Sequence, residues 1–78
     1  MNVLQSLTAG EMSLAERTAG LSIATLEDPN FPKVDILAAL AWVYARREDR
    51  TITFEAYKDS KTLEEISDVL GLNDEEGN

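Results

Sequence analysis

Hydrophobic residues recur along this chain at helical spacing, and short polar signals mark where each helix begins and ends. Thr8 and Glu11 form a capping box, in which the side chain of each residue bonds the backbone N–H of the other. Gly20 is the residue type that favours a left-handed helix stop. The pattern therefore predicts a helix over residues 9–19, followed by a turn or short helical stretch near residues 22–26.

Residues 33–47 form the most hydrophobic stretch, and their apolar side chains point nearly all round a helix. A helix with that pattern is buried rather than lying on the surface. Its large side chains make one stripe: Ile36, Leu40, Val43 and Tyr44. Its small side chains make a second stripe, where another helix can approach closely: Ala38, Ala41 and Ala45. Two prolines within residues 28–32 exclude regular structure just before this helix.

Two further helices are predicted after residue 50. Thr53 is placed to cap a short helix, and Thr62 with Glu65 forms a second capping box. Gly71 is placed to stop the last helix. The side chains expected to point inward from that helix are Leu63, Ile66, Val69 and Leu70.

The sequence therefore predicts an all-α fold, a small bundle of three to four short helices around a central hydrophobic helix at about residues 33–47. We expect a single helical domain over residues 1–72. Residues 73–78 contain three acids and no apolar side chain, which is typical of a disordered acidic tail. Packing around the central helix must supply most of the order, because isolated helices of this length are marginal in water.

The formal net charge of −8 arises from 15 acidic and 7 basic residues. Lys and Arg neutralise phosphates in nucleic-acid complexes, so this balance argues against a nucleic-acid partner. It also disfavours an anionic membrane surface, and no apolar run approaches the roughly 20 residues of a membrane span. The N-terminus lacks the pattern of a signal peptide. We expect a cytoplasmic protein with no membrane association.

The chain contains neither His nor Cys, which removes the most common proton-transfer side chain and every thiol nucleophile. Adjacent acids such as Glu64 and Glu65 point about 100° apart on a helix and do not converge on one atom. The glycines are placed at helix ends or in the tail, so no phosphate-binding loop is predicted. We therefore expect no catalytic residues, no metal site and no cofactor.

Aromatic and basic residues gather in the middle of the chain and are the candidates for partner binding: Trp42, Tyr44, Arg46, Arg47, Phe54 and Tyr57. Trp and Arg are enriched at binding hot spots, but aromatic side chains also fill cores. Trp42 is either buried against the first or last helix or part of an interface, and the sequence leaves both open.

The arginines also have two interpretations. They either cap the central helix and pair with Glu48, Asp49 and the acids of the last helix, or they orient an acidic partner or a neighbouring copy. We favour the first role. The charge asymmetry keeps the second open, since residues 32–50 carry net +1, residues 1–31 net −3 and residues 51–78 net −6.

Three short segments follow one another along the chain in an order that is typical of one protein family: LTAGE at residues 7–11, LAWVYARRED at residues 40–49 and TFEA at residues 53–56. This order resembles the small tail assembly chaperones of long-tailed bacteriophages and prophages, and the resemblance extends over about residues 7–70. It implies a non-catalytic protein that coats the tape measure protein and helps recruit tail tube protein. It also implies a place in the host cytoplasm, absence from the mature virion, and contacts between copies in a homo-oligomer.

Two other functions remain open from the sequence. One is an acidic nucleic-acid mimic that inhibits a host protein, which would need carboxylates spaced like phosphates along one face. The other is a small structural component of the virion, such as a head–tail connector.

The phage chaperone family that the chain resembles is often made in two lengths. In a longer form, the additional C-terminal domain would join after Leu72.

Overall fold

The computed structural model describes residues 3–27, 30 and 33–71, and this part of the chain contains helices and no strand. The elements are, in order, two 3-10 helices and four α-helices: η1 (Val3–Ser6), α1 (Ala9–Ala19), η2 (Ile23–Glu27), α2 (Val34–Ala45), α3 (Phe54–Ser60) and α4 (Leu63–Leu70). The all-α prediction is confirmed. The predicted acidic tail and most of the proline segment lie outside the described residues.

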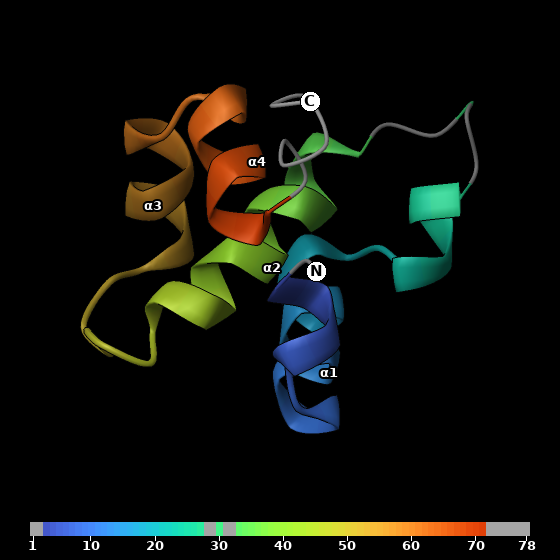
Figure 1. Cartoon of the computed structure of the whole chain (residues 1–78), viewed down its shortest axis with the longest axis horizontal. Coiled ribbons are helices and arrows are strands. Elements are labelled where there is room, and N and C mark those ends of the chain that lie inside the picture. The colour runs from blue at the N-terminus through green and yellow to red at the C-terminus, as the bar shows by residue number, and fades with distance from the viewer. Residues whose placement is uncertain (1–2, 28–29, 31–32, 72–78) are drawn as a thin grey trace.

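Helix α2 is the centre of the molecule, with α1 packed on one side and α3 and α4 on the other (Figure 1). Ile36 and every residue from Ala38 to Val43 are buried. This burial on all sides is what the apolar pattern predicted, because a helix covered by neighbours on several faces has no solvated stripe. Outside α2, the core is completed by residues from each neighbour: Leu7, Ala15, Tyr57, Ile66 and Leu70.

The central helix is shorter than the predicted residues 33–47. Regular hydrogen bonding ends at Ala45, after which the N–H of Arg47 bonds the carbonyl of Tyr44 at 3.2 Å and the N–H of Glu48 bonds that of Ala45 at 3.1 Å. These bonds span three residues rather than four, so the chain tightens and leaves the helix axis. Arg46 and Arg47 consequently lie on a turn.

The predicted N-terminal caps and glycine stops are confirmed. Both capping boxes are formed, by Thr8 with Glu11 and by Thr62 with Glu65, and Thr53 caps α3 by accepting from the N–H of Ala56 at 3.1 Å. The two glycine stops adopt the left-handed conformation, with φ of 72° at Gly20 and 76° at Gly71. A side chain at either position would be strained, which is why glycine ends these helices.

The predicted inward face of α4 needs one correction. Ile66 and Leu70 are buried and Val69 is half-buried, but Leu63 is 51% exposed. Leu63 is the first residue of α4, one turn before Ile66. The first turn of α4 therefore extends beyond the core, which buries this helix only from Ile66 onward. The same fraction is exposed at Val34, the first residue of α2. Among the helices described, none has both the length and the apolarity to cross a bilayer.

Candidate partner-binding site

Trp42 lies in the core, with only 8% of its surface exposed. Its indole Nε1 donates a hydrogen bond to the carbonyl oxygen of Ile52 at 2.9 Å, and its ring meets that of Phe54 edge-to-face at 5.8 Å. The guanidinium of Arg46 covers the ring at 5.1 Å. The interpretation of Trp42 as a surface anchor is therefore corrected, since a covered ring offers a partner no contact. Its hydrogen bond and its ring contact join it to the segment that opens α3.

Tyr57 is also a core residue, with 4% of its surface exposed. Burial raises the pKa of its phenol above the ordinary value, and the negative charge of Glu65 adds to this effect. Phe54 is half-buried, and the Nζ of Lys58 lies 5.0 Å from the centre of its ring. Lys61 lies 5.8 Å from the Tyr57 ring in the same way. Both aromatic side chains of α3 thus face inward, with a lysine over each ring.

Arg47 connects the end of α2 to α1 and η1. Its Nε and Nη2 donate to the two carboxylate oxygens of Glu11 at 2.9 and 2.7 Å, and Nη2 also donates to the carbonyl of Ser6 at 2.9 Å. The same guanidinium lies 5.2 Å from the ring of Tyr44. The sequence-based expectation had Arg47 pairing with Glu48, Asp49 or the last helix. That expectation is wrong, because the fold brings a carboxylate from a residue 36 positions away into bidentate geometry.

This ion pair is the main electrostatic link between α1 and α2. The guanidinium of Arg47 lowers the pKa of Glu11 from an ordinary 4.5 to about 2, with a further contribution from the Thr8 N–H. The carboxylate in turn raises the pKa of Arg47. Both side chains keep contact with water, at 40% and 23% exposed, so solvent screening limits what the pair contributes to stability.

Glu11→Gln is expected to lower the free energy of unfolding by about 1 kcal/mol near neutral pH. Glutamine can still complete the capping box, so the change isolates the charge. Because the folded-state pKa of Glu11 is depressed, its contribution is present above the unfolded pKa and disappears as the pH falls toward 2. Thermal denaturation of both proteins should show their melting temperatures converging in acid. A difference that persists at the lowest pH would contradict the charge-based account.

An open groove of about 670 Å³ lies where the end of α2 meets α3 and α4. Its apolar lining comes from all three helices and the connector before α3: Tyr44, Ala45, Ile52, Ala56, Tyr57 and Val69. Polar and charged side chains complete it: Arg47, Glu48, Asp49, Ser60 and Lys61. Of the six residues predicted for partner binding, Tyr44, Arg47 and Tyr57 line this groove. Phe54 and Trp42 are absent from its lining, and Arg46 lines another pocket.

The smaller groove residues are not among the six candidates chosen from the sequence. Ala45, Ala56 and Val69 belong to three different helices, and each alone looks like an ordinary packing residue. No sequence pattern places them together, because the groove exists only once α3 and α4 lie across the end of α2. The helical spacing of Ala38, Ala41 and Ala45 was the one available signal, since it indicated a close approach by another helix.

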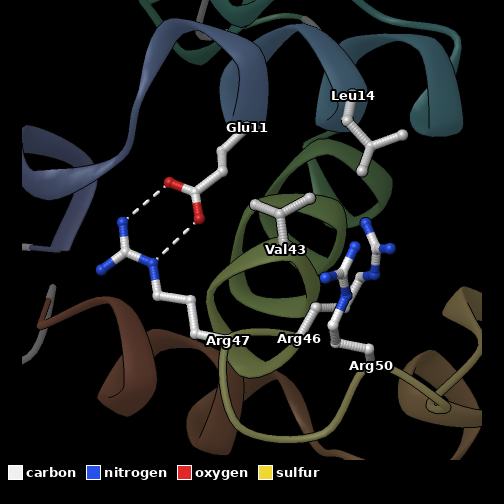
Figure 2. Close-up of a pocket in the computed structure, with 6 residues that line it drawn as sticks. All are labelled: Glu11, Leu14, Val43, Arg46, Arg47 and Arg50. Carbon is white, nitrogen blue, oxygen red and sulfur yellow. Dashed lines mark hydrogen bonds and ion pairs between the residues drawn. The ribbon is translucent and has the colours of Figure 1, made fainter.

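A second, smaller pocket of about 360 Å³ lies between α1 and the end of α2. We call it the arginine pocket, and its lining residues are Glu11, Leu14, Val43, Arg46, Arg47 and Arg50. In Figure 2 the Glu11–Arg47 pair lies on one side of Val43, and the guanidinium groups of Arg46 and Arg50 lie together on the other. Both pockets offer recognition by shape and charge. Among the residues described, no three acids gather as a metal site would require.

No protein-family model, curated protein or solved structure matches this chain.

Proposed function

We propose that this chain is a non-catalytic chaperone of phage tail assembly, which holds an apolar helical face of the tape measure protein in its groove. The observation that carries the proposal is the groove itself, an apolar floor open to solvent on a protein of net charge −8. Such a surface suits a client that must be kept soluble until it is assembled. The chain would act in the host cytoplasm and leave before the virion is complete.

The chemistry of the groove fits an amphipathic helix. Binding modes of this kind place apolar side chains at helical spacing into a hydrophobic groove, while charged groups at the rim meet the polar face. Here Tyr44 and Val69 contribute apolar lining, and both signs of charge are present, with Arg47 and Lys61 against Glu48 and Asp49. A volume of about 670 Å³ accommodates several side chains of such a helix at once.

The segments that carry the family resemblance also support the proposal. Residues 40–49 supply Tyr44, Ala45 and the charged turn that follows α2, and residues 53–56 supply Ala56. Two of the three segments that carry the resemblance thus supply residues that line the groove. This links the resemblance to a surface rather than to the core alone.

Ala56→Arg tests the groove directly. Ala56 is exposed and lies in the first turn of α3, so a long cationic side chain there obstructs the groove without entering the core. Co-expressed with the tape measure protein of its own phage or prophage, this variant should retain roughly tenfold less client in a pull-down than the wild-type chain, the size expected for loss of a central contact. The soluble fraction of the tape measure protein should fall in parallel.

Ala9→Arg is the matched control, because Ala9 is also exposed and lies in the first turn of α1, outside the groove. It changes charge and size equally and should bind like the wild-type chain. Equal client binding by all three proteins would remove the groove from the proposal. Recovery of the chain in purified mature particles would favour a structural virion component, and capture of a host nuclease would favour a nucleic-acid mimic.

A further inference from the structure

The arginine pocket combines an apolar floor with two adjacent cations. Leu14 of α1 and Val43 of α2 line it, together with Arg46 and Arg50, whose side chains lie on the same side of Val43 in Figure 2. Arg46 is held there because its guanidinium stacks on the Trp42 ring at 5.1 Å. The pocket is therefore a built feature, in which one of the two cations is fixed by the core.

Neither Arg46 nor Arg50 forms an ion pair with any residue in the described part of the chain, where the pairs are Arg47–Glu11 and Lys58–Asp35. Two cations that line one small pocket repel each other. A carboxylate placed between the two guanidinium groups would remove this repulsion and accept charge-assisted hydrogen bonds. The pocket thus fits an acidic group attached to an apolar side chain.

The same chain carries such a group at the start of α4. Leu63 is 51% exposed, and its neighbour Glu64 is exposed and forms no ion pair with a described residue. The other large apolar side chain exposed to this extent, Val34, is a poorer match. Its acidic neighbour Asp35 is already paired with Lys58 at 3.4 Å.

We propose that the arginine pocket of one copy binds Leu63 and Glu64 of a second copy. Leu63 would cover Leu14, and the carboxylate of Glu64 would meet Arg46 and Arg50. One copy cannot make this contact with itself, because the turn after α2 and the start of α4 lie at opposite ends of α3 (Figure 1). The contact therefore requires a second copy, and two copies can each supply their pocket to the other.

This association is expected to be weak and sensitive to salt. One apolar side chain and two exposed charge contacts contribute little, and a stable interface buries far more surface than this pocket offers. The proposal does not depend on the client, and the chain alone is sufficient to test it. Sedimentation equilibrium of the full chain should show a mass that rises with concentration and falls back toward the monomer in high salt.

Leu63→Ser should reduce self-association by about tenfold, the effect of removing one buried leucine from a small contact. Val34→Ser is the matched control, because both side chains are 51% exposed at the first residue of a helix. It should associate like the wild-type chain. Equal association by both variants would overturn the docking of Leu63.

Glu64→Lys separates specific docking from general charge effects. It makes the net charge less negative, which would strengthen association if repulsion between copies were the control. Docking predicts the opposite, a loss of about tenfold from reversing the contact with two guanidinium groups. A double variant, Arg46→Glu with Arg50→Glu, should lose association to a similar degree.

Mixing the two charge-reversed proteins should restore a complex that neither forms alone, because each then supplies the charge that the other lacks. Circular dichroism of each variant checks that the fold is retained. A wild-type chain that stays monomeric at all concentrations in low salt would overturn the proposal. So would a mixture that fails to associate.

Discussion

Replacing Trp42 by alanine is expected to unfold a large part of the protein population, with a loss of about 3–5 kcal/mol in the free energy of unfolding. Trp42 is 8% exposed, and it joins α2 to the segment that opens α3 through one hydrogen bond and one aromatic contact. A domain of 78 residues has a total stability of only roughly 4–12 kcal/mol. Urea denaturation followed by far-ultraviolet circular dichroism measures the loss.

Trp42→Phe is the informative comparison for this variant. It keeps an aromatic ring against Phe54 and removes the Nε1–H that the carbonyl of Ile52 accepts. The expected cost is about 1–2 kcal/mol, mainly from the carbonyl left without its donor. An alanine variant with full helicity and an unchanged midpoint would show that Trp42 has no core role, and would return it to the candidates for partner contact.

Ala41→Leu is expected to lower the free energy of unfolding by about 1–3 kcal/mol, because the larger side chain overfills a packed contact. Ala41 is fully buried. It shares the small-residue stripe of α2 with Ala45, which lines the groove beside Tyr57 and Val69, so the stripe faces α3 and α4. Leucine and alanine have similar helix propensities, and the loss therefore reports on packing alone.

Thermal denaturation measures this effect, at about 4–8 °C in melting temperature for each kcal/mol in a domain of this size. Ala9→Leu makes the same substitution at an exposed position and should change stability by less than about 0.5 kcal/mol. A leucine variant more stable than the wild-type chain would mean that the contact between α2 and its neighbours contains a void.

The local features of the fold could be predicted because the atoms that cause them lie within a few residues of one another. The capping box joins Thr8 to Glu11, three positions apart, and the left-handed stop at Gly20 depends on the backbone of that residue. The bounds of α1 followed from these two signals alone. The burial of α2 was equally readable, since an apolar pattern on every face leaves no side for water.

The candidate site could not be predicted in the same way, because its contacts join distant parts of the chain. Arg47 was expected to pair with nearby acids. Its partner is instead Glu11 of α1, which lies 36 positions earlier in the chain. Trp42 was left between core and interface, and the carbonyl of Ile52 decided for the core. Leu63 fits the helical period of an inward face, but the buried part of that face begins one turn later, at Ile66.

The sequence by itself therefore determined which segments are helices, where most of them begin and end, and which helix is central, through interactions within single turns. Only the tertiary structure decided which side chains remain available to a partner. Availability depends on how neighbouring helices cover one another, and no local pattern encodes that. The aromatic and basic candidates chosen from the sequence are thus divided between the core, the wall of an apolar groove and the edge of the arginine pocket.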